Sequence, residues 1–122
     1  MTTDTIDFQS SLAQFIGTTQ YYFNPLYPWL KYTDGVQYFA ENAGGGAYWF
    51  LDIVGTELHQ YARRLKFLTV DLTVNQGQTA KIVVTDGNDH ELFEKLIEWT
   101  DCPAGTWRFF LQQGVLMLTS EY

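Results

Sequence analysis

The sequence predicts an α+β fold in which N-terminal helices pack on one face of a C-terminal antiparallel sheet of about five strands, joined as a meander. Apolar residues recur at helical spacing in the first half, and from residue 68 onward they alternate with polar residues, as in half-buried strands. A chain that places its helices before its strands favours one helical layer on one sheet. Neither a repeat nor a linker interrupts the 122 residues, so we expect residues 1–122 to form a single domain.

Three helices are expected in the first half. The first covers about residues 5–16 and ends before Gly17, since glycine is common just after helices. The second covers about residues 35–42, because Asp34 and the glutamine three residues later have the spacing of a capping box. The third covers about residues 47–63, where apolar side chains again recur at helical spacing.

The second half is expected to hold the strands. Alternating apolar residues, bounded by turn residues, predict strands at about residues 68–74, 80–85, 107–111 and 115–119. The segment Leu92–Trp99 fits two structures, because its pattern is that of an amphipathic helix, yet it follows the turn at residues 86–89 directly. We interpret this segment as the middle strand of the meander, with a helix as the alternative.

The composition favours a protein partner over a nucleic acid or a membrane. The chain has 14 acidic and 7 basic residues, for a net charge of −7, whereas binding to phosphate groups requires a positive surface. Aromatic residues make up 17% of the chain, and Tyr and Trp are enriched at protein interfaces. We therefore expect a protein partner with a basic surface, and no direct binding to nucleic acid or to a membrane.

The sequence contains no recognised catalytic motif, so we expect the protein not to be an enzyme and to use no cofactor. Gly44-Gly45-Gly46 lacks the Lys and the hydroxyl residue of a phosphate-binding loop, and we interpret it as a connection between two helices. His59 and His90 are far apart, and Cys102 has no obvious base beside it, so neither a metal site nor a catalytic thiol is expected. The first residues resemble no signal peptide and no apolar run is long enough to cross a bilayer, which favours the cytoplasm.

Two groups of residues are candidates for a functional site. In the first, two carboxylates occur among aromatic residues, which suits acid–base chemistry or a small ligand, although one of them also has the position of a helix cap. This group consists of Tyr32, Asp34, Tyr38, Tyr48, Trp49 and Asp52. The second group is an acidic stretch that suits a basic partner, although acidic residues are also common on the solvated face of a hairpin. It consists of Asp86, Asp89, Glu91, Glu94, Glu98 and Asp101.

Several short motifs occur in order along the chain. They are Phe15-Ile16-Gly17-Thr18 with Tyr21-Tyr22, Tyr32-Thr33-Asp34-Gly35-Val36, Gly46-Ala47-Tyr48-Trp49 with Leu51-Asp52, Trp99-Thr100-Asp101, Gly114-Val115-Leu116-Met117-Leu118, and Ser120-Glu121-Tyr122. Together they resemble an uncharacterised bacterial family, a domain of unknown function. The resemblance implies no established activity, and the occurrence of the family in cyanobacteria, other bacteria and mobile elements implies phage or plasmid biology. Relatives usually have an aromatic residue at the position of Cys102, which argues against a catalytic thiol.

These observations favour a small acidic protein-binding module. One form of this hypothesis is an inhibitor that a phage or another mobile element carries against a host nuclease or defence system. The alternative is a small-ligand binder, or a small enzyme, that uses an aromatic pocket with Asp34 and Asp52. An accessory role, for example as a homodimer, is the third alternative.

Overall fold

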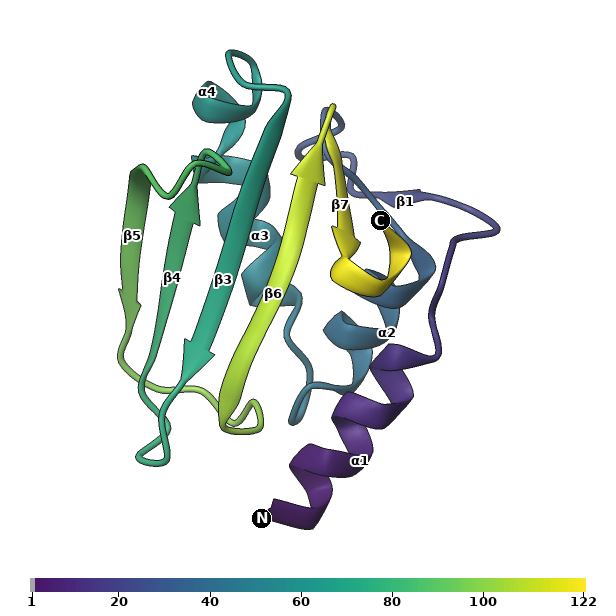
Figure 1. The fold of residues 1–122 in the computed structure, drawn as a ribbon, viewed down its shortest axis with the longest axis vertical. Coiled ribbons are helices and arrows are strands. Elements are labelled where there is room, and N and C mark those ends of the chain that lie inside the picture. The colour runs from purple at the N-terminus through teal and green to yellow at the C-terminus, as the bar shows by residue number, and fades with distance from the viewer. Residues whose placement is uncertain (1) are drawn as a thin grey trace.

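A computed structural model describes residues 2–122, with side chains from residue 7 onward. The strands form one sheet in the order β1-β2-β7-β6-β3-β4-β5 (Figure 1). The strands are β1 (Tyr22–Phe23), β2 (Lys31–Tyr32), β3 (Phe67–Val74), β4 (Ala80–Thr85), β5 (Glu91–Ile97), β6 (Gly105–Gln112) and β7 (Val115–Leu118). The helices are α1 (Thr2–Ala13), α2 (Asp34–Asn42), α3 (Tyr48–Glu57) and α4 (His59–Ala62), and a 3-10 turn, η1, covers Thr119–Glu121.

The predicted α+β fold, with helices before most of the strands, is confirmed, and the sheet is larger than expected. The described residues form seven strands, because β1 and β2 from the N-terminal half extend the sheet beyond β7. Only β3, β4 and β5 form a meander, since β6 pairs with β3 and not with β5. The ambiguous segment Leu92–Trp99 is mainly strand, as interpreted, because β5 runs along β4 as far as Ile97.

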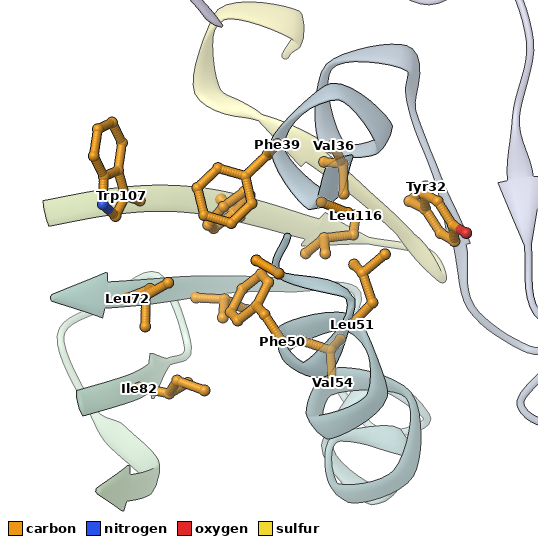
Figure 2. Packing of buried hydrophobic residues seen from close by; sticks show 14 of the residues in the cluster. Tyr32, Val36, Phe39, Phe50, Leu51, Val54, Leu72, Ile82, Trp107 and Leu116 are labelled. Atoms are coloured by element: carbon orange, nitrogen blue, oxygen red, sulfur yellow. The ribbon is translucent and has the colours of Figure 1, made fainter. Parts of the chain in front are cut away.

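One face of the sheet is covered by helices, and the core lies between the two layers. Figure 2 shows Phe39 of α2 and Phe50 of α3 pointing toward the strands. Their rings lie 5.0 Å and 4.8 Å, between centroids, from that of Phe109 in β6, and all three side chains are fully buried. Burying such a side chain contributes about 1.5–3 kcal/mol to folding. Within the described residues, no helix has the length and the apolar character that crossing a bilayer requires.

Two predicted helix boundaries were wrong. α1 begins at Thr2 and ends at Ala13, well before Gly17. The next two amides donate to carbonyl oxygens three residues back, at 3.3 Å and 3.1 Å, so the chain leaves the helix through a tighter turn. The third predicted helix is divided into α3 and α4 at Leu58. In α3 the Thr56 hydroxyl donates to the carbonyl oxygen four residues earlier (2.7 Å), a contact that often bends helices.

The cap of α2 is Thr33 and not Asp34. The Thr33 hydroxyl accepts a hydrogen bond from the backbone N–H of Val36 at 3.3 Å, as an N-cap side chain does. The expected capping box therefore begins one residue too late. Both residue types are good caps, and the Asp34 carboxylate has a different partner in the structure, described below.

The second face of the sheet, which we call the open face, has none of the described helices over it (Figure 1). Three aromatic rings pack together there. The ring centroid of Phe110 in β6 lies 5.1 Å from that of Phe67 in β3 and 5.0 Å from that of Tyr122. The C-terminal turn thus covers part of this face, while none of the described helices covers its β4 and β5 side (Figure 1).

Candidate functional site

Part of the predicted acidic stretch lies along a free edge of the sheet. β5 is the last strand in the sheet order and, among the described strands, pairs only with β4 (Figure 1). Glu91 and Glu94 belong to this strand, and Glu98 follows it directly. All three side chains are exposed. The structure therefore brings these three predicted carboxylates to one edge.

An irregularity in the strand pairing turns two of these carboxylates to the same side. Glu94 lies opposite Val83 and Glu91 lies opposite Thr85, with a shift of register between Val84 and Thr85. Val83 and Thr85 alternate with the buried residues of β4, so both belong to the open face. Residues three apart in a regular strand point to opposite faces. The shift therefore places Glu91 and Glu94 together on the open face.

The two lysines of β4 and β5 are each paired with a glutamate. Lys81 Nζ lies 3.5 Å from Glu94 Oε2, and Lys95 Nζ lies 3.0 Å from Glu57 Oε2. The four side chains are 37–46% exposed, so each pair contributes at most about 1 kcal/mol to stability. The pairs nevertheless compensate the cations of this edge, which leaves Glu91 and Glu98 as its uncompensated charges.

Two large apolar side chains are exposed beside these carboxylates. Leu96 is 72% exposed and Trp99 is 64% exposed. Leu96 lies opposite Lys81 and therefore on the open face, like Glu94. Leu96 and Trp99 line different hollows near the end of β5. Large apolar anchors beside acidic residues are typical of protein interfaces.

The surface is hollowed on both sides of this segment. One hollow of about 520 Å³ lies between the turn that joins β3 to β4 and the residues Leu96, Ile97 and Glu98. A second hollow of about 420 Å³ is lined by Ile97, Trp49 and Trp99, together with the loop that precedes α3. Trp49, a member of the first predicted group, therefore lies beside the acidic edge.

Asp101 fastens a loop. Its carboxylate accepts a hydrogen bond from the backbone N–H of Gly45 at 2.7 Å. Gly44 has a φ of +61° and lies against the backbone carbonyl of Asp101, where a side chain has no room. The glycine run is thus a tightly packed connection between α2 and α3.

Asp86 organises the turn between β4 and β5. Its carboxylate accepts hydrogen bonds from the backbone N–H groups of Asn88 (2.8 Å) and His90 (3.2 Å), and it contacts the His90 ring at 2.9 Å. These hydrogen bonds, first that of Asn88, lower the pKa of Asp86 below its ordinary value. Asp89 is exposed in the same turn. In the described part of the chain, no three His, Cys, Asp or Glu side chains converge as metal ligands.

Asp34 holds the segment that follows α1. Its carboxylate accepts hydrogen bonds from the backbone N–H (2.9 Å) and the hydroxyl (3.0 Å) of Thr19, and its own N–H donates to the Thr18 hydroxyl at 2.9 Å. The backbone hydrogen bond is the largest cause that lowers the pKa of Asp34. The carboxylate is thus occupied by its own chain.

Asp52 holds the loop between β1 and β2. It accepts a hydrogen bond from the Tyr27 hydroxyl at 2.6 Å, and the Tyr27 ring lies flat in the space left by Gly55. Burial, and then this hydrogen bond, raise the pKa of Tyr27 above its ordinary value. Trp29 supports the same loop, because its indole N–H donates to the Gly55 carbonyl oxygen at 2.8 Å.

The four aromatic residues of the first predicted group lie in three places. Tyr32 is buried and stacks on Tyr22 with centroids 5.8 Å apart, and its pKa is raised first by burial and then by the nearby Tyr48, Tyr22 and Asp52. Tyr38 packs on Phe8 and Phe15 of the N-terminal segment, and Trp49 lies beside the acidic edge, as described above. The structure thus groups Tyr32 and Tyr48 with Asp52, and it separates Tyr38 and Trp49 from them.

Four residues with a role in the structure were not predicted as site residues: Leu96, Trp99, Tyr27 and Glu121. Glu121 accepts hydrogen bonds from the Thr33 hydroxyl (2.6 Å), the backbone N–H of Gly35 (3.0 Å) and that of Leu118 (2.9 Å). The only indication of this role in the sequence is that Glu121 belongs to the motif Ser120-Glu121-Tyr122. Trp99 also lies in such a motif, and the alternation of Glu94, Leu96 and Glu98 was a signal that Leu96 shares a side with the acidic residues.

A family model described as "Family of unknown function (DUF6876)" matches residues 6–122, so the chain belongs to this family. The family resemblance expected from the short motifs is thereby confirmed. Neither a curated protein nor a solved structure matches the chain.

Proposed function

We propose that this member of the family is a protein-binding module and that it uses the free edge of the sheet to bind a partner. We call the residues concerned the β5 edge surface, and they are Glu91, Glu94, Leu96, Glu98 and Trp99. The observation that carries the proposal is the exposure of Leu96 and Trp99, at 72% and 64%, beside carboxylates and between two hollows. Interfaces of this kind combine large apolar anchors with a polar rim.

The charge of the surface favours a basic partner. The net charge of the chain is −7, and both lysines of the edge are paired with glutamates. Opposite charge on a partner speeds encounter, and like charge excludes wrong partners. The nucleic-acid groove of a nuclease or a defence protein has this basic character, so an inhibitor carried by a mobile element is the form of the proposal that we favour.

The alternative, a small-ligand binder or small enzyme at Asp34 and Asp52, has less support. Both carboxylates accept hydrogen bonds from the protein itself, so each already has a role in holding a loop. A ligand at Asp52 would be lost in Asp52→Asn while the fold remains. Binding of one defined small molecule by the native protein and not by Asp52→Asn would favour this alternative.

The test of the proposal is capture of a partner by matched variants. Tagged protein is purified from its host, or from a close relative, and co-purifying proteins are identified by mass spectrometry at low and moderate salt. We expect one stoichiometric protein that native protein retains and that the double variant Leu96→Ala, Trp99→Ala loses. The control is the double variant Tyr21→Ala, Leu26→Ala, since these side chains are 58% and 86% exposed elsewhere on the molecule.

Two outcomes would overturn the proposal. One is a protein partner that the Leu96 and Trp99 variant retains in full. The other is a retained small molecule with no protein. A partner that the native protein and the control variant both retain, and that the edge variant loses, supports it.

Charge reversal tests the electrostatic part separately. Glu91→Lys with Glu98→Lys is compared with Asp7→Lys and Glu41→Lys, which change the net charge equally at other exposed positions. We expect the edge reversal to slow association with the captured partner by about tenfold or more at low salt, within the range that electrostatic steering covers. Association rates that fall equally in both variants would show that overall charge, and not this edge, steers the partner.

A further inference from the structure

We infer that the partner adds an extended segment to β5 as a further strand of the sheet, with basic side chains on the open face and apolar side chains on the helical face. This inference rests on the proposed function and specifies its mode of binding. An added strand gains main-chain hydrogen bonds along its length, and alternate side chains give specificity.

The first support is the free backbone of β5. The strand ends the sheet order, and nothing lies beside its outer side in Figure 1. Its regular part, Phe93–Ile97, pairs residue by residue with β4 on the inner side only. A strand in this position presents a row of N–H and C=O groups to an added segment. The register shift lies near the start of β5 and leaves this regular part intact.

The second support is the division of side chains between the two faces. Glu94 and Leu96 point to the open face, while Phe93, Lys95 and Ile97 lie opposite buried residues of β4 and point to the helical face. Lys95 is paired there with Glu57 of α3. On the open face, a segment that alternates basic and apolar residues meets the carboxylates of Glu91 and Glu94, the second of which it shares with Lys81. On the helical face it meets the half-buried Phe93 and Ile97.

A second copy of this chain meets like charges in three of the registers in which it could pair with the same edge. In a two-fold antiparallel pair that continues the sheet, each residue faces one from the same face. A pair centred on Glu94 opposes Glu94 to itself, and one centred on Lys95 opposes two lysines. A pair centred on Leu96 opposes Glu94 to Glu98. Like charges directly opposite are destabilising, so a basic segment avoids a cost that a second copy meets in these three registers.

The test uses a short synthetic peptide of alternating lysine and valine. Hydrogen exchange of the native protein is measured with and without the peptide, and we expect slower exchange for those amides of Phe93–Ile97 that point away from β4. A peptide of the same sequence, with N-methyl groups on the amides of one side only, keeps the charges and loses one row of donors. We expect its affinity to fall by about tenfold or more, which is about 1.4 kcal/mol.

The protein variant for this test is Glu94→Lys, with Glu41→Lys as the matched control on α2. We expect Glu94→Lys alone to weaken peptide binding by about tenfold or more. The inference is overturned if the lysine–valine peptide does not bind, if the N-methylated peptide binds equally well, or if binding leaves the exchange of β5 unchanged. A natural partner still lost by the Leu96 and Trp99 variant would then leave the proposed function standing without strand addition.

Discussion

Removal of the Glu121 side chain is expected to cost a large part of the stability of the fold. The carboxylate joins the C-terminal turn to the start of α2, across 88 positions of sequence between Thr33 and Glu121. Glu121→Ala leaves the backbone N–H groups of Gly35 and Leu118 without their acceptor. It also removes the partner of the Thr33 hydroxyl, which caps α2.

The magnitude follows from these three hydrogen bonds. A hydrogen bond to a charged group contributes about 1.5–3 kcal/mol, and the contributions of three bonds to one carboxylate do not add fully. Because the carboxylate is only part-buried, we expect a loss of about 2–3 kcal/mol from a total of about 5–15 kcal/mol. With an unfolding entropy of about 2.1 cal/mol/K per residue, this loss lowers the Tm by about 8–12 °C.

The assay is urea unfolding followed by circular dichroism and tryptophan fluorescence. Glu121→Gln keeps the volume and one acceptor oxygen, and we expect about half of the loss. The control is Glu98→Ala, because this exposed carboxylate makes no hydrogen bond or ion pair in the described structure, and we expect a change below about 0.5 kcal/mol. A Glu121→Ala protein whose stability equals that of the control, with an unchanged m-value, would refute the account of Glu121.

Three further predictions concern the loops and the thiol. Gly55→Ala places a methyl group where the Tyr27 ring lies, and we expect the free energy of unfolding, measured in urea, to fall by about 1–3 kcal/mol. Gly17→Ala is the control, because there is open space around Gly17. The pKa of Asp34 is lowered in the folded protein, first by a backbone hydrogen bond. Its ionised carboxylate therefore stabilises the fold at pH values above the ordinary Asp pKa of about 4, and this contribution is lost as the pH falls through the lower pKa of the folded state. Between about pH 5 and pH 2, we expect the urea unfolding midpoint of Asp34→Asn to fall less than that of native protein. An equal fall of the two midpoints with pH would contradict this. Burial raises the pKa of Cys102, so we expect a thiol reagent to label it only at the rate of unfolding, and rapid labelling of native protein would be inconsistent with the buried thiol.

The parts of the fold that depend on local pattern were predictable from the sequence. The alternation of apolar residues from Leu68 to Val74 predicted β3, and every apolar member of that alternation is buried. The two-residue strands β1 and β2 carry no such alternation. They are strands because β7, far along the chain, supplies the parallel partner of β2. The place of β6 beside β3 depends in the same way on pairing between distant segments.

The candidate site was predictable in its charge and not in its anchors. The acidic stretch pointed to the β5 edge, yet Asp86 and Asp101 hold loops there, and only contacts in three dimensions reveal that. Trp99 was not predicted as a site residue because its residue type does not indicate whether it is buried or exposed. An aromatic residue suits a core as well as an interface, so its exposure follows from the path of the chain after β5.

The position of β7 has a consequence for the order in which the protein is assembled during synthesis. β7 lies between β2 and β6, so the segment with β1 and β2 has no sheet to join until residues 115–118 have left the ribosome. The hydrogen bond that the Thr33 hydroxyl donates likewise forms only once Glu121 has been made. The segment with β1 and β2 is therefore made well before its partner β7, and closure of the sheet is a long-range event that slows folding. For that period, Tyr32, which is buried in the folded sheet, and Tyr22, which stacks on it there, are a natural target for a chaperone.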